Sequence, residues 1–127
     1  MSITPYLCVA DARRAIDWYG AVLAARVTYE PIIMDDGRVG HVELTIGDAV
    51  VMMAEPFPEL GVDAPDPTAG VSVSLQLLVP EVDPVARAAA DAGAILDRGP
   101  ESTDHGRVAV LRDPFGHRWM LTDGRPA

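Results

Sequence analysis

The first residues with chemical potential are a histidine and a glutamate separated by one position, within Gly40-His-Val-Glu-Leu-Thr-Ile46. Polar and aliphatic side chains alternate through this stretch, which predicts a strand that buries one face. His41 and Glu43 then share the other face, because alternate residues of a strand point to the same side. Two interpretations stay open: an acid/base pair or part of a metal-ligand set, and a hydrogen-bonded pair with a structural role only.

The remaining candidates for chemistry are isolated in the sequence. His105 precedes Gly106, and His117 follows a turn-forming Asp-Pro-Phe-Gly, so turn positions explain both histidines without catalysis. Ser74 lies outside any Gly-x-Ser-x-Gly setting, so serine hydrolase chemistry is not indicated. Cys8 is the single cysteine, and a lone thiol is typical of the reducing cytoplasm, where we expect the protein to be located.

Charge and hydropathy exclude several classes of partner. The formal net charge of −9 repels polyanions, so we expect no nucleic-acid partner. Such a field also favours cationic ligands, although many acidic proteins bind none. The N-terminus lacks the features of a secretory signal, and the longest apolar run, residues 49–54, is too short to cross a bilayer. We therefore expect no membrane partner.

The elements that position these residues form two successive sets, and the 127 residues suit a single domain. In the first set we expect a strand over 3–9, a helix capped by Asp11, and strands over 26–33, 39–46 and 49–55. A proline-rich, acidic stretch without periodicity, residues 56–70, follows as a connector. The boundaries are therefore module one at about 1–55, a linker at about 56–70, and module two at about 71–124.

The second set repeats the order of the first. A strand is expected over 71–79, then a helix with Asp83 as N-cap and Gly93 as terminator, then strands over 94–98, 107–112 and 117–122. Thr4 matches Ser74 at an offset of 70 residues, and Met52 matches Met120 at an offset of 68. Landmarks that stay in step favour a duplicated strand-helix-strand-strand-strand unit.

This organisation resembles the vicinal oxygen chelate superfamily, which contains glyoxalase I, bleomycin-resistance proteins and extradiol dioxygenases. Ile3-Thr-Pro-Tyr-Leu-Cys-Val-Ala-Asp11 is similar to the family's opening strand and helix start, and Asp113-Pro-Phe-Gly-His-Arg-Trp-Met-Leu121 to its closing hairpin and last strand. The sequences around His41 and Gly116 are most similar to the small glyoxalase-like branch. The resemblance implies an α+β fold of two βαβββ modules, whose mixed, curved sheets form a cup.

The resemblance also implies four positions for metal ligands, which metal-using members fill with His, Gln or Glu. Here those positions are occupied by Thr4, Met52, Ser74 and Met120. Hydroxyls and thioethers are poor ligands for Zn²⁺, Ni²⁺ or Fe²⁺, so we expect neither a metal nor another cofactor.

The cup implied by the resemblance would combine apolar walls with a few polar groups, as ligand pockets do. Its expected lining is Tyr6, His41, Glu43, Met52, Ser74, Gln76, Arg107 and Met120. Arg107 is placed there as the counterpart of His41, able to bind an anion or to pair with Glu43.

Two functions follow from this reading. The first is a metal-independent small-molecule-binding protein that sequesters an antibiotic or metabolite, as bleomycin-resistance proteins do. The alternative is a glyoxalase-like lyase, isomerase or dioxygenase with a relocated metal site made of His41, Glu43 and His105 or His117. No catalytic residue is assigned, and the resemblance implies a homodimer.

Overall fold

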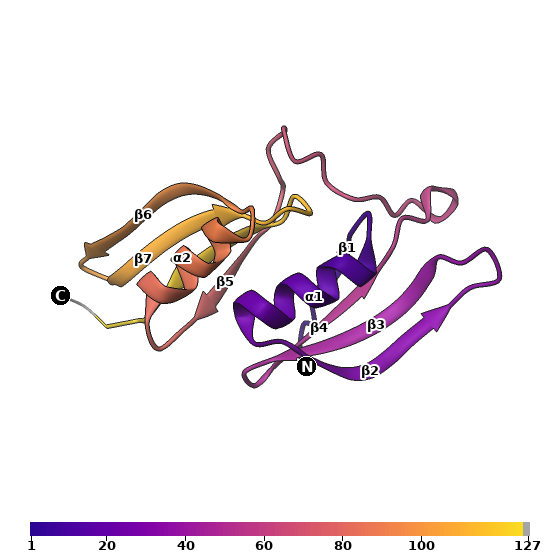
Figure 1. Ribbon diagram of the computed structural model, residues 1–127, viewed down its shortest axis with the longest axis horizontal. Coiled ribbons are helices and arrows are strands. Elements are labelled where there is room, and N and C mark those ends of the chain that lie inside the picture. The colour runs from indigo at the N-terminus through magenta and orange to yellow at the C-terminus, as the bar shows by residue number, and fades with distance from the viewer. Residues whose placement is uncertain (126–127) are drawn as a thin grey trace. The chain divides into compact units, whose positions relative to one another are not determined.

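The computed structural model describes residues 1–125, and the chain forms two compact units. The first unit covers Met1–Pro65 and the second begins at Asp66, so the division falls within the expected connector. Each unit has the order strand, helix and three strands (Figure 1). The prediction of an α+β fold built from two βαβββ modules is confirmed.

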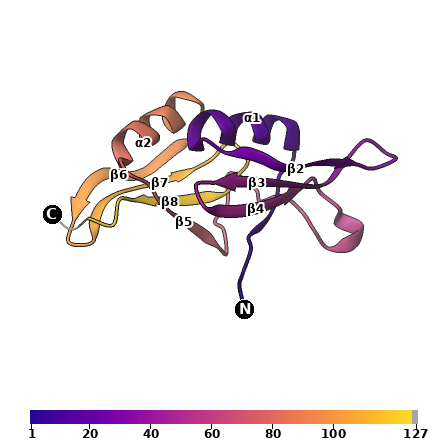
Figure 2. The ribbon, with the colours of Figure 1, turned by 90° about the horizontal axis from the view of Figure 1, so that it is seen from below.

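The first unit is a four-stranded mixed sheet with one helix. Its elements are β1 (Tyr6–Cys8), α1 (Ala12–Leu23), β2 (Arg26–Ile33), β3 (Val39–Ile46) and β4 (Ala49–Ala54). The strand order is β1-β4-β3-β2, with β1 parallel to β4 and the other neighbours antiparallel. Helix α1 lies along one face of this sheet (Figure 2). A short 3₁₀ helix, η1 (Pro58–Leu60), follows in the connector.

Helix α1 begins where the sequence predicts. The Asp11 side chain accepts a hydrogen bond from the Arg14 backbone N–H at 3.1 Å, the usual bond of an N-cap. The small or aromatic residues of one stripe are buried against the sheet: Ala12, Ala15, Tyr19 and Val22. The helix ends at Leu23 and is capped by Ala24, whose left-handed backbone lets its N–H bond to the Tyr19 carbonyl.

Strand β3 is divided cleanly between core and surface. Val42, Leu44 and Ile46 are buried against the helix side, and the polar residues between them are half-buried on the other face. This period-two pattern fixes the register, since a shift of one residue would bury the polar set. The face that carries His41 and Glu43 is therefore set by the apolar residues that alternate with them.

The second unit repeats the topology. Its elements are β5 (Ser74–Leu78), α2 (Val82–Asp91), β6 (Ile95–Thr103), β7 (Gly106–Arg112) and β8 (Arg118–Thr122), with sheet order β5-β8-β7-β6. Tyr6 pairs with Met52 in the first sheet, and Gln76 pairs with Met120 in the second. The offsets of 70 and 68 residues found in the sequence thus correspond to equivalent strand positions.

The start of α2 differs from the prediction. The helix begins at Val82 with Glu81 as N-cap, and the Glu81 side chain makes no capping hydrogen bond. Asp83 lies in the first turn, where its carboxylate pairs with Arg107. The predicted N-cap, Asp83, is wrong by two residues, because the Asp83 carboxylate pairs with Arg107 of β7 and does not cap the helix. Gly93 follows the helix with φ of +100°, as a terminating glycine should.

A buried aspartate organises the hairpin between β7 and β8. The Asp113 carboxylate accepts hydrogen bonds from the backbone N–H groups of Phe115 and His117 and from the Trp119 indole, at 2.9, 3.0 and 2.8 Å. Asp113 is 3% exposed, so these bonds replace its lost hydration. The Asp-Pro-Phe-Gly motif is thus explained by turn structure, and His117 takes part through its backbone.

Neither helix in the described residues 1–125 has the length and apolar character that a membrane-spanning helix requires.

Replacing Asp113 with alanine is expected to lower the free energy of unfolding by about 3 kcal/mol, because three donors around a buried site lose their acceptor. Urea denaturation followed by Trp fluorescence measures the change. The matched control is Asp97→Ala, an exposed aspartate in the same unit, which should change stability by less than about 0.5 kcal/mol. Equal effects from the two variants would contradict this role for Asp113.

Candidate functional site

Four of the expected site residues gather on one face of the first sheet. Tyr6 on β1 pairs with Met52 on β4, which in turn pairs with Glu43 on β3. Residues paired across strands share a face, and His41 lies on the same side as Glu43 two positions away. We call this surface, opposite α1, the open face of the first unit.

The polar groups of the open face form a hydrogen-bonded chain. Tyr6 Oη lies 2.5 Å from His41 Nδ1, and His41 Nε2 lies 2.8 Å from a carboxylate oxygen of Glu43. The edge of the Tyr29 ring packs against the imidazole, with centroids 5.6 Å apart. His41 is therefore held on three sides, and both of its ring nitrogens have partners.

The direction of these hydrogen bonds follows from the chemistry of the partners. A carboxylate only accepts, so in the neutral imidazole the proton lies on Nε2 and points to Glu43. His41 Nδ1 is then an acceptor, and the Tyr6 hydroxyl donates to it. Burial and the nearby Glu43 charge raise the pKa of Tyr6, which keeps the phenol protonated as this arrangement requires.

A hollow of about 290 Å³ adjoins the hydrogen-bonded residues Tyr6, His41 and Glu43 within the first unit. It is lined by Tyr6, Gly40, Ala54, Phe57, Leu60 and Val62. The last three come from the connector, where η1 and the backbone pairing of Phe57 with Val62 form a compact loop. Gly61 closes that loop with φ of +76°, a conformation that suits glycine. We call this hollow the Tyr6 pocket.

The sequence interpretation missed this contribution of the connector. Residues 56–70 lack periodicity, and their prolines and acidic residues indicated a linker only. The available signal was the spacing of three apolar residues around the Pro-Glu-Leu-Gly turn, which is unusual for a solvated linker. Loops carry binding residues when they are fixed to a scaffold, and this loop is fixed to the sheet by its contacts.

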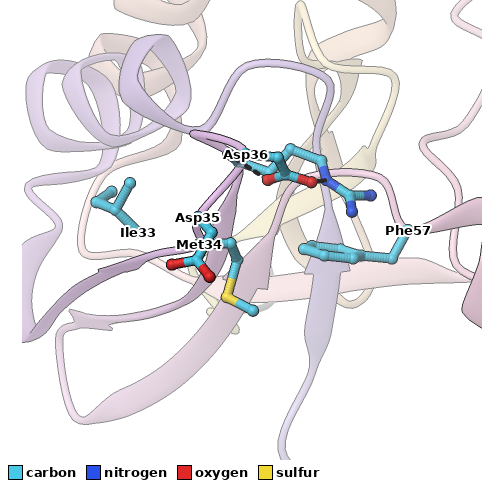
Figure 3. A pocket seen from close by; sticks show the side chains of 6 residues that line it. Ile33, Met34, Asp35, Asp36 and Phe57 are labelled. Carbon is cyan, nitrogen blue, oxygen red and sulfur yellow. Dashed lines mark hydrogen bonds and ion pairs between the residues drawn. The ribbon is translucent and has the colours of Figure 1, made fainter.

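Arg38 is the main anchor of the connector. Asp36 and Phe57 both line the hollow drawn in Figure 3. The Arg38 guanidinium lies 3.9 Å from the centre of the Phe57 ring and pairs with Asp36 at 2.7 Å and with Glu59 at 2.8 Å. The hydrogen bond from Arg38 lowers the pKa of Glu59 to about 2. A second hollow of about 350 Å³ lies here, lined by Ile33, Met34, Asp35, Asp36, Arg38 and Phe57. Arg38 is the one cation among these lining residues, and it is already paired with the Asp36 and Glu59 carboxylates.

Cys8 lies two residues after Tyr6 on the same side of β1, and it is buried. Burial, together with the charges of Asp63 and Glu55, raises its pKa to about 11. A thiol with that pKa is protonated at neutral pH, and the thiolate is the nucleophilic form. Cys8 is therefore a core residue.

Three expected site residues share a face in the second unit. Gln76 pairs with Met120, and Met120 pairs with Val110 on β7. Ser74 lies two residues before Gln76 on the same face, and its hydroxyl accepts a hydrogen bond from Arg118 at 2.8 Å. The single cup that would join this group to the open face of the first unit stays a prediction.

Arg107 does not belong to this group. It shares the helix side of β7 with the buried Ala109 and Leu111, and its guanidinium makes two hydrogen bonds of 2.8 Å to Asp83 of α2. The expectation that it lines the cup is corrected by the strand register. Met120 pairs with Val110 as Met52 pairs with Glu43, so Val108 is the counterpart of His41, and a shift of one residue reverses the face.

The residues present do not fit a divalent cation at the four family positions. Met52 and Met120 offer thioethers, the Ser74 hydroxyl is bonded to Arg118, and Thr4 precedes β1 and is exposed. The relocated ligand set does not form either. Within residues 1–125 no three His, Cys, Asp or Glu side chains gather in a way that could hold a metal ion, and His41 Nε2 is hydrogen-bonded to Glu43 Oε2.

Comparisons with known proteins agree with this fold. The family model of the Glyoxalase/Bleomycin resistance protein/Dioxygenase superfamily matches residues 3–121. An uncharacterized protein of Mycobacterium bovis, Mb0911c, is 35% identical over 129 residues, which cover 98% of this chain and 83% of that protein.

Two solved structures are similar to this chain in fold. The hypothetical protein SA1046 from S. aureus has a TM-score of 0.76 at 21% identity, covering 96% of this chain and 92% of its own. TioX from Micromonospora sp. ML1 has a TM-score of 0.71 at 25% identity, covering 98% of this chain and 99% of its own. The resemblance inferred from the sequence is confirmed.

The hydrogen-bonded chain predicts the tautomer of His41. Nitrogen-15 NMR of the imidazole should show a protonated Nε2 and an accepting Nδ1, because Glu43 can only accept. His105 in the β6–β7 turn serves as the reference histidine in the same spectrum. A His41 protonated on Nδ1 alone would contradict the arrangement.

Proposed function

Because the chain belongs to the Glyoxalase/Bleomycin resistance protein/Dioxygenase superfamily, we propose that it is a metal-independent protein that binds a small molecule on the open face of its first unit. The observation that carries this proposal is the position of the Tyr6 pocket beside the Tyr6–His41–Glu43 chain. An apolar wall next to a few convergent polar groups is the usual composition of a ligand site.

The size and lining of the pocket suit part of a small organic molecule. Its volume of about 290 Å³ is close to the lower end of ligand pockets, which is roughly 300 Å³. Phe57, Leu60 and Val62 offer surface to an aromatic or aliphatic body. The Tyr6 hydroxyl lies at the edge of that surface, where it can meet a polar group of the ligand.

The protonation states favour binding over catalysis. The pKa of Tyr6 and the pKa of Cys8 are both raised, so neither residue supplies an anionic nucleophile near neutral pH. The family positions that hold a metal elsewhere offer thioethers and hydroxyls here. Binding alone lowers the free concentration of a toxic compound, so we propose that the protein sequesters an antibiotic or metabolite.

We also propose that the protein acts as a homodimer. Large apolar side chains are exposed on edge strands of both sheets, including Tyr29 and Ile33 on β2, Leu78 on β5 and Ile95 on β6. Exposed apolar surface of this kind is typical of protein interfaces, and a two-fold dimer is the commonest soluble assembly. Light scattering at micromolar concentration should give twice the chain mass, and a monomer would overturn this proposal.

Ligand binding should be unaffected by removal of metals. A thermal-shift screen against aldehydes, aromatic diols and glycopeptide antibiotics should yield a compound that raises the melting temperature equally with and without EDTA. Elemental analysis of the same sample should find no stoichiometric Zn²⁺, Ni²⁺ or Fe²⁺. Binding that disappears with EDTA and returns with one of these metals would sink the proposal.

Leu60→Ala is expected to weaken binding of that compound about tenfold, because an apolar contact worth roughly 1 to 1.5 kcal/mol is lost. Leu60 is 74% exposed, so the substitution should leave the fold intact. Val73→Ala is the control, since Val73 is exposed to a similar extent in the second unit. Isothermal titration calorimetry compares the two, and equal affinities would place the ligand elsewhere.

A further inference from the structure

We propose that the Tyr6 pocket selects a cationic ligand, namely a protonated amine carried on an apolar body. This inference rests on the proposed function and adds the chemical class of the ligand. It follows from a count of protons along the Tyr6–His41–Glu43 chain, from the reach of the free acceptor atoms, and from the charges around the pocket.

The hydrogen-bonded chain Tyr6–His41–Glu43 has no N–H or O–H proton that it could donate to a ligand. The His41 Nε2–H is directed to Glu43 at 2.8 Å, and the Tyr6 hydroxyl proton is directed to His41 Nδ1 at 2.5 Å. The Glu43 carboxylate has no proton to give. The carbonyl of Gly40, 3.4 Å from Tyr6 Oη, is a further acceptor. The Tyr6 hydroxyl and the Gly40 carbonyl, from two residues that line the pocket, can therefore only accept a hydrogen bond from a ligand.

The acceptor atoms are within reach of a ligand. Tyr6 is 52% exposed, and its oxygen keeps a lone pair after donating its proton. The Glu43 side chain is 26% exposed, and within the described residues it engages His41 through Oε2, so Oε1 can accept a second bond. A ligand ammonium in the pocket can donate a hydrogen bond to the Tyr6 oxygen, while the Glu43 charge attracts it through space. A ligand carboxylate or carbonyl would find acceptors facing it, which is unfavourable.

The charges near the pocket have the same sign. Glu43 ends the Tyr6–His41–Glu43 chain that adjoins the pocket, and Glu55 and Asp63 lie close enough to raise the pKa of the buried Cys8, two residues after Tyr6 on β1. Arg38 stacks on Phe57 of the pocket lining, and its charge is already paired with Asp36 and Glu59. The formal net charge of −9 adds a long-range field that attracts cations.

The aromatic lining suits an ammonium group as well. The ring of Tyr6 borders the pocket, and a cation close to such a ring face is stabilised by its quadrupole, whereas the Phe57 ring already carries the Arg38 guanidinium. The apolar remainder of the ligand can lie against Leu60 and Val62. An amine joined directly to an aromatic or aliphatic body satisfies both parts of the site.

Three probes with one apolar body test the inference: 1-naphthylmethylamine, 1-naphthylmethanol and 1-naphthoate. Their affinities for the unaltered protein are measured by NMR titration at pH 8. The amine should bind at least tenfold more tightly than the alcohol, and the carboxylate should bind most weakly. A carboxylate that binds as tightly as the amine would overturn the inference, and this comparison needs no variant.

The Glu43→Gln variant provides a second test, in which the affinities of the amine and the alcohol are compared again. The substitution keeps the shape of the side chain and removes its charge, so the ratio of amine to alcohol affinity should fall about tenfold. Glu30→Gln is the control, because it removes the same charge from an exposed site on β2 of the same unit. A ratio that is equal in the two variants would count against selection by Glu43.

The outcomes separate the inference from the proposed function. If the alcohol binds and the amine has no advantage, the pocket remains a ligand site and the inference fails. If none of the three probes binds, the inference and the proposed small-molecule site both fail. Amide spectra of each variant verify that its fold is unchanged.

Discussion

The alternation of β3 between core and surface is the constraint on which the site depends. Val42, Leu44 and Ile46 must be covered by α1, and the pleat then directs the residues between them to the opposite side. The hydrophobic stabilisation of the core thus holds His41 and Glu43 in place on the exposed side. Their relative position is as rigid as the strand, which allows a hydrogen bond between residues two apart to persist.

Much of this organisation follows from the sequence, because it depends on local rules. The Asp11 cap and the polar-apolar alternation through β3 are properties of short segments, and the structure has both as predicted. The prediction that Arg107 lines the cup is wrong because the register of the two modules differs by one residue at this strand. Matched landmarks in the sequence do not reveal such a difference, but it moves the side chain to the opposite face of the sheet. The Asp83 cap failed for a related reason: a long-range partner outweighed a local preference.

The sequence predicts the part of the candidate site that lies on the strands, and it does not predict the part that comes from the connector. Tyr6, His41, Glu43 and Met52 were expected on one face, and the register brings them there. The apolar wall from Phe57 to Val62 could not be inferred, since its position depends on the stacking of Arg38 on Phe57 and on paired charges of the connector. Such contacts join residues about twenty positions apart and leave no periodic trace. The four positions that the resemblance assigns to metal ligands hold Thr4, Met52, Ser74 and Met120, which can be read from the sequence directly.

The central claim is that the open face of the first unit is the place where a ligand binds. The most direct measurement is NMR mapping, in which chemical-shift changes caused by 1-naphthylmethylamine are assigned residue by residue. The account predicts that the largest changes occur at Tyr6, His41, Phe57 and Val62. Changes confined to the second unit, for example around Asp83 and Arg107, would contradict it.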